Sequence, residues 1–124
     1  MTRFWISIDE AVHFVLRSLT DMKGGEIFIP KMPSFRVVDL AVAIEGTELE
    51  WNGFKHTKVI GIRPGEKLHE TLVTLHDSSR VVEHLRHYVI HPEWHSTAYE
   101  MLNLVYSSDT NVKWLSVQDL RRLV

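Results

Sequence analysis

The segment Lys58–Glu70 carries the residue types that best suit a charged ligand. Its composition predicts a strand at Lys58–Ile62, a turn at Arg63-Pro64-Gly65 and a short helix from Glu66 to about Val73. Proline confines the preceding residue to an extended backbone, so the turn fixes where the Arg63 side chain starts. A guanidinium beside the open N–H groups of a helix start can bind a phosphate or pyrophosphate with two hydrogen bonds at once.

Glu66 is a second candidate in the same segment. In the first turn of a helix it would repel a phosphate, so it is better placed to accept hydrogen bonds from sugar hydroxyls. A purely structural interpretation stays open, in which Glu66 favours the helix start and Arg63 pairs with a surface carboxylate. His69, three residues after Glu66, is either another ligand-facing group or a half-buried helix residue.

The chain has eight histidines, which is an unusual number for its length. Four of them are spaced three, four and four residues apart, as on one helix face: His84, His87, His91 and His95. Pro92 lies inside that span, however, and Tyr88–Ile90 has the composition of a strand. We therefore predict solvated histidines here and no metal site.

Several catalytic motifs are missing from the 124 residues. There is no cysteine, which excludes thiolate nucleophiles and thiolate zinc ligands. Gly-x-Gly-x-x-Gly, Gly-x-Ser-x-Gly and Tyr-x-x-x-Lys do not occur, and Gly61–Lys67 lacks the spacing of a P-loop. The net charge of −2 disfavours nucleic acid as a partner. The longest uncharged run, Met101–Ser108, is far shorter than the about 20 residues that span a membrane.

The expected elements are short and alternate in type, which indicates a single mixed α/β domain over residues 1–124. Ser7 and Glu10 form a capping box before a helix whose apolar stripe runs from Ile8 to Met22. Gly24-Gly25 should end that helix, and Glu26–Pro30 has the composition of a strand.

The rest of the chain contains two further helix signals and one ambiguous hairpin. Ser34 can cap a helix whose apolar face runs from Val37 to Ile44. Ser116 and Asp119 predict the start of a last helix, with Val117, Leu120 and Val124 on its buried side. The Asn52-Gly53 pair favours a hairpin at Glu48–Phe54, although a plain loop fits nearly as well.

Four stretches of the sequence are similar to one known family. They are Met1–Ile6 (MTRFWI), Gly24–Ser34 (GGEIFIPKMPS), Val59–Glu70 (VIGIRPGEKLHE) and Tyr106–Leu123 (YSSDTNVKWLSVQDLRRL). In this order they resemble the C-terminal, substrate-binding part of the inverting UDP-N-acetylglucosamine 4,6-dehydratases. These are extended short-chain dehydrogenase/reductases (SDRs) of polysaccharide biosynthesis and flagellin glycosylation.

The resemblance implies an α/β fold in which this lobe holds a UDP-sugar. By position, Thr2, Arg63 and Glu66 match substrate-binding residues of the family, although Thr2 is expected to fray at the N-terminus. The family's Rossmann domain, its Gly-rich cofactor loop and its catalytic Tyr-x-x-x-Lys belong to a part that these residues lack. We therefore expect this chain to contain no catalytic residue and to bind no cofactor, whereas the full-length family uses NADP or NAD.

The leading hypothesis is thus the UDP-N-acetylglucosamine-binding part of a cytoplasmic 4,6-dehydratase, a lyase that is inactive in this form alone. Its expected partners are the missing Rossmann domain or further copies of the enzyme, and neither nucleic acid nor membrane. One alternative is a stand-alone nucleotide-sugar-binding module or a subunit of a split enzyme. Another is a fragment of a related UDP-sugar C4-epimerase, whose substrate lobe is similar. Apolar helix stripes left uncovered would form an exposed patch.

Overall fold

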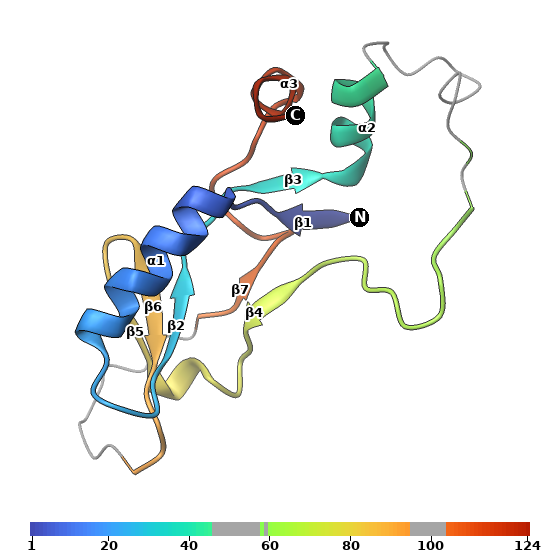
Figure 1. Cartoon of the computed structure of the whole chain (residues 1–124). Helices are drawn as coiled ribbons and strands as arrows, with labels where there is room; N and C mark the ends of the chain where they lie inside the picture. The colour runs from blue at the N-terminus through green and yellow to red at the C-terminus, as the bar shows by residue number, and fades with distance from the viewer. Residues whose placement is uncertain (46–57, 59, 95–103) are drawn as a thin grey trace. The chain divides into compact units, whose positions relative to one another are not determined.

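The computed structural model describes residues 1–45, 58, 60–94 and 104–124 (Figure 1). These residues form a mixed α/β fold, as the sequence predicted, in two compact units. The first unit consists of Met1–Trp5, Pro33–Glu70 and Ser108–Val124, and the second of Ile6–Met32 and Thr71–Ser107. The single domain over 1–124 stays a prediction, and the hairpin expected at Glu48–Phe54 lies outside the described residues.

The first unit pairs a small sheet with two helices. Strand β1 (Thr2–Phe4) runs antiparallel to β3 (Ser34–Arg36), with Arg3 opposite Phe35. Helices α2 (Val37–Glu45) and α3 (Val117–Leu123) pack together. Their core is Phe35, Ala43 and the fully buried Leu120, and Trp5 meets Phe35 edge-on at 5.7 Å between ring centroids. The capping box of Ser116 and Asp119 is confirmed.

The prediction that Ser34 caps α2 is wrong. Ser34 lies in β3 and is completely buried, and its Oγ accepts a hydrogen bond from the Asn111 amide at 3.0 Å. Its backbone N–H donates to the Lys113 carbonyl, and its own carbonyl accepts from the Leu115 N–H. These partners lie more than 70 residues away in the sequence, so the residues next to Ser34 do not reveal them.

The second unit is built on a three-stranded antiparallel sheet in the order β2-β6-β5 (Ile27–Pro30, His87–Ile90 and Val81–Glu83). The strands predicted around Ile27–Pro30 and Tyr88–Ile90 are therefore confirmed. A 3₁₀ turn, η1 (Ser78–Arg80), precedes β5, and β4 (Thr71–Val73) pairs with β7 (Tyr106–Ser107).

Helix α1 (Ile8–Asp21) belongs to the second unit and begins with the predicted capping box of Ser7 and Glu10. It ends one residue before Met22, earlier than the predicted Gly24-Gly25, which follow with positive φ. The helix contacts the sheet through Phe14, whose ring lies 6.1 Å from that of His87. Its predicted apolar stripe is largely exposed, with Ile8 80% and Leu19 59% accessible, so this unit presents an apolar surface. None of the described helices is long and apolar enough to cross a membrane.

Two predictions for the segment that carries the candidate site are wrong. Lys58 and residues 60–62 form no strand, and Gly61 has φ +77°, which takes the chain out of an extended path. The expected helix from Glu66 to Val73 does not form, because residues 66–70 are irregular, with a bend at Leu68-His69, and lead into β4. The backbone groups of Leu68 and Glu70 bond to Thr2 and Ser108, and this long-range pairing replaces the local bonds of a helix.

Candidate functional site

The turn Arg63–Glu66 holds both charged candidates. Gly65 adopts φ +81° after Pro64, which is the arrangement of a type II turn, and the Glu66 N–H donates to the Arg63 carbonyl at 3.0 Å. The Glu66 carboxylate accepts the Arg63 backbone N–H at 3.0 Å, so it closes the turn from the other side. The turn is exposed, and among the described residues no partner occupies the Arg63 guanidinium. A planar cation on a closed turn suits an oxyanion.

Strand β1 anchors the loop that follows this turn. The Thr2 backbone N–H donates to the Leu68 carbonyl at 2.9 Å. The Arg3 guanidinium donates to the carbonyls of Lys67 at 2.9 Å and Leu68 at 3.3 Å, and it lies 3.4 Å from the Glu70 carboxylate. The backbone and side chains of β1 therefore hold residues 67–70 in place. The turn Arg63–Glu66 directly precedes this anchored loop.

The hydroxyl of Thr2 lies between two polar side chains. Its Oγ1 is 2.8 Å from His69 Nδ1 and 2.6 Å from Ser108 Oγ, and Ser108 Oγ accepts the Glu70 N–H at 2.9 Å. Thr2 is only 7% exposed and Ser108 is completely buried. The expectation that Thr2 frays is wrong, because its backbone pairs with Arg36 and its hydroxyl is enclosed.

The structure thus brings the three predicted site residues onto one connected substructure. Arg63 and Glu66 share the turn, and Thr2 is joined through His69 to the same loop. His69 is half-buried, as one of its two interpretations required, but it lies in a bend and not in a helix. Sequence reasoning did not find the roles of Arg3 and Ser108. Arg3 lies in the stretch MTRFWI and Ser108 in the stretch YSSDTNVKWLSVQDLRRL, and membership of these family-like stretches was the one indication that the sequence offered.

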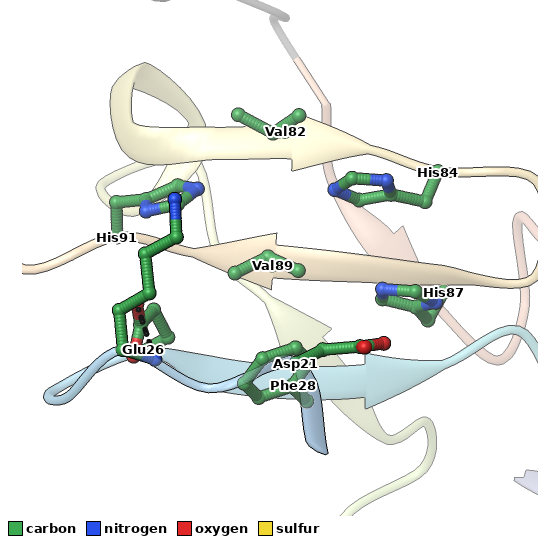
Figure 2. A pocket seen from close by; sticks show the side chains of 9 residues that line it. Asp21, Glu26, Phe28, Val82, His84, His87, Val89 and His91 are labelled. Atoms are coloured by element: carbon green, nitrogen blue, oxygen red, sulfur yellow. Dashed lines mark hydrogen bonds between the residues drawn. The ribbon is translucent and has the colours of Figure 1, made fainter. Parts of the chain in front are cut away.

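A hollow lies on one face of the β2-β6-β5 sheet, within the second unit. It has a volume of about 360 Å³ and an apolar floor of Phe28, Val82 and Val89, and His84, His87 and His91 stand around it (Figure 2). The rings of His84 and His87 stack at 4.6 Å between centroids. Burial, and then the neighbouring His84, lower the pKa of His87 below its ordinary value.

One acidic side chain at the rim of this hollow, Glu26, already accepts hydrogen bonds from the backbone. The Glu26 carboxylate accepts the backbone N–H of Gly24 at 2.7 Å and of Lys23 at 3.2 Å, and these bonds lower the pKa of Glu26 (Figure 2). The part of the chain that the structure describes brings no three histidine or acidic side chains together as metal ligands.

Comparison with known proteins places the chain in a family. A family model described as polysaccharide biosynthesis protein matches residues 1–92. The inverting UDP-N-acetylglucosamine 4,6-dehydratase of Campylobacter jejuni is 38% identical over the whole of this chain, which covers 40% of that protein. A protein of Methanocaldococcus jannaschii described as an uncharacterized membrane protein, MJ1061, is 36% identical over the whole chain, which covers 38% of it.

The structure agrees with these sequence relationships. The X-ray structure of Pen from Bacillus thuringiensis superposes with a TM-score of 0.79 at 28% identity, over 99% of this chain and 37% of that one. The chain therefore spans about two-fifths of the length of its relatives. The predicted resemblance to inverting UDP-N-acetylglucosamine 4,6-dehydratases is confirmed, and the chain belongs to the polysaccharide biosynthesis protein family.

Proposed function

We propose that this chain is the UDP-sugar-binding part of a UDP-N-acetylglucosamine 4,6-dehydratase that inverts C5, in cytoplasmic glycan biosynthesis. One observation carries the proposal. In a chain 38% identical to the Campylobacter jejuni dehydratase, Arg63 lies exposed on a closed turn whose following loop β1 fixes in place. The closed turn orders the backbone of Arg63 before binding, so that only its side chain has to be ordered when it binds a diphosphate.

Each site residue has a role in this proposal. Arg63 binds the diphosphate of the UDP-sugar through paired hydrogen bonds. Glu66 already accepts the Arg63 N–H through one carboxylate oxygen, and its remaining acceptor capacity serves hydroxyl groups of the ligand. Thr2 belongs to the site through the loop that it holds, since its backbone binds Leu68 and its hydroxyl binds His69.

The redox and proton-transfer steps are assigned to residues outside the 124. The chain has neither Gly-x-Gly-x-x-Gly nor Tyr-x-x-x-Lys, so we propose that it binds neither NADP nor NAD and forms no product alone. Those functions would come from the Rossmann domain of the intact enzyme, joined to this chain or carried by a partner subunit. Purified chain given NADP and UDP-N-acetylglucosamine should yield no 4-keto sugar, and measurable turnover would contradict this assignment.

The binding proposal is tested by an NMR amide titration with UDP-N-acetylglucosamine. Saturable shifts should gather at residues 63–70, and the Arg63→Ala variant should lose them. Arg86→Ala is the matched control, because Arg86 is also exposed but lies in the turn between β5 and β6. A well-dispersed spectrum without shifts up to millimolar ligand, or equal shifts in Arg63→Ala, would refute binding by this site.

A further inference from the structure

We propose that His69 is a further ligand-binding residue of this site, held by Thr2 and Ser108 as a hydrogen-bond donor through Nε2. The inference rests on the proposed function, because the acceptor is an oxygen of the nucleotide sugar. It also changes the role of Thr2, which becomes a positioning residue that acts through His69.

A chain of three short contacts carries the proposal. Ser108 Oγ lies 2.6 Å from Thr2 Oγ1, and Thr2 Oγ1 lies 2.8 Å from His69 Nδ1. The backbone N–H of Glu70 donates to Ser108 Oγ at 2.9 Å, so Ser108 is already an acceptor at one end of this series of hydrogen bonds. Thr2 is 7% exposed and Ser108 is not exposed at all, so bulk water cannot serve these two hydroxyls.

The burial of Ser108 and Thr2 determines which group donates in each of these hydrogen bonds. Ser108 Oγ already accepts a hydrogen bond, and among the described residues the acceptor in reach of its own proton is Thr2 Oγ1. Thr2 then donates its proton to His69 Nδ1. The reverse direction would leave the buried Ser108 hydroxyl as a donor without an acceptor, which proteins avoid. His69 Nδ1 is therefore bare, and the single N–H of the neutral ring is on Nε2.

This tautomer leaves His69 with a donor for a ligand. His69 is half-buried, and its Nε2 makes no hydrogen bond to any residue that the structure describes. It lies three residues after Glu66, on the loop that Arg3 and Thr2 hold. A neutral N–H complements an oxygen acceptor, whereas the carboxylate of Glu66, three residues earlier in the loop, complements a donor. The loop thus presents a cation, an acceptor and a neutral donor from Arg63, Glu66 and His69.

The tautomer is measured directly by long-range ¹H–¹⁵N NMR of the imidazole rings in the full chain without ligand. At a pH of about 8, where an ordinary imidazole is neutral, His69 should show a bare Nδ1 and a protonated Nε2. Thr2→Val, which removes the hydroxyl but keeps the shape, should give a mixture of tautomers, and Thr2→Ser should restore the wild-type signal. A protonated Nδ1 in the wild type overturns the proposal, even if Thr2→Val does not fold.

Binding of UDP-N-acetylglucosamine tests the ligand role. His69→Phe should weaken binding about 3- to 10-fold, the usual effect of losing one hydrogen bond, whereas His69→Gln keeps a donor and should bind more tightly than His69→Phe. Titrations with UDP and with uridine show which oxygen His69 meets. If Arg63→Ala loses binding and His69→Phe does not, the role of His69 is refuted and the proposed function stands. If no ligand binds, the proposed function fails, and the tautomer result still shows whether Thr2 positions His69.

Discussion

At the scale of single residues, Tyr106 shows how one side chain supports two separate segments. Its hydroxyl accepts the Met32 N–H at 2.7 Å and donates to the Met32 carbonyl at 3.0 Å, although 74 residues separate them. The side chain is 5% exposed, and burial raises the pKa of Tyr106 above its ordinary value. The neutral hydroxyl therefore satisfies both polar groups of one backbone residue where little water is available.

We predict that Tyr106→Phe lowers the free energy of unfolding of the second unit by about 1–3 kcal/mol, because the partly buried N–H and carbonyl of Met32 both lose their hydrogen bonds to the Tyr106 hydroxyl. Urea unfolding, followed through amide signals of that unit, measures the loss. Tyr88→Phe is the control, since Tyr88 is equally buried but its hydroxyl makes no hydrogen bond among the described residues. Equal losses in the two variants would refute this explanation.

The candidate site could be predicted from the sequence only in part. Arg63 and Glu66 were found because their residue types and the Pro64-Gly65 turn are local information. Arg3 was not found, because what it does depends on carbonyl groups more than 60 residues away. Ser108 was not found for the same reason, since its hydroxyl meets Thr2 across 106 positions of the sequence. Sequence spacing does not report such contacts.

At the scale of elements, α3 stabilises the first unit mainly through Leu120, with Val117 partly buried against the same core. Leu120 is completely buried and packs with Phe35 and Ala43, whereas Leu123, one turn later, is 48% exposed. The helix has only seven residues, too few to be stable in isolation. Its stability must therefore come from packing and from the capping box of Ser116 and Asp119, which contributes about 1 kcal/mol.

We predict that Leu120→Ala lowers the free energy of unfolding by about 2–5 kcal/mol, because it opens a cavity in the core of the first unit. Leu123→Ala in the same helix should cost no more than about 1 kcal/mol, since its side chain is half exposed. The two variants are compared by their midpoints of urea unfolding. Both replace leucine by alanine in α3, so the change in helix propensity is the same. Similar midpoints would show that α3 contributes little to the unit.

The sequence predicted elements best where their signals are local. Both capping boxes and the strand at Ile27–Pro30 are confirmed, because each depends on residues within one turn or one strand. The strand at Lys58–Ile62 is wrong, because the positive φ of Gly61 takes the chain out of an extended path. The helix after Glu66 is wrong, because β1 and Ser108 bond to the backbone of Leu68 and Glu70. The periodicity of apolar residues also predicted helix α1 correctly. It did not predict whether the apolar side of α1 is buried, and that side is largely exposed. What covers an element is decided by distant parts of a chain.

At the scale of the whole molecule, the balance of charge responds to pH near neutrality. The formal charge is −2 with neutral histidines, and eight histidines gain charge as the pH falls. His87 differs from an ordinary histidine, because burial and the stacked ring of His84 lower its pKa. Asp21 opposes that shift, and Arg17 and Lys31 add to it. The folded chain therefore holds His87 in its neutral form more strongly than the unfolded chain does.

The direction of the resulting pH effect follows from linkage. Between the lowered pKa in the fold and the ordinary value of about 6.5, the unfolded state binds more protons at His87. The contribution of neutral His87 to stability is complete above pH of about 6.5 and is lost progressively as the pH falls below it. We predict that the urea midpoint of the second unit decreases between pH of about 7.5 and 5.5.

His87→Phe separates this effect from the charging of the other histidines. Phenylalanine stays neutral at every pH and keeps an aromatic ring beside Phe14 and Phe28, whose centroids lie 6.1 and 5.8 Å from that of His87. The variant should therefore lose less stability between pH of about 7.5 and 5.5 than the wild type does. His76→Gln, at an exposed position, should leave the wild-type pH dependence unchanged. A pH dependence in His87→Phe as steep as that of the wild type would mean that groups other than His87 cause the decrease.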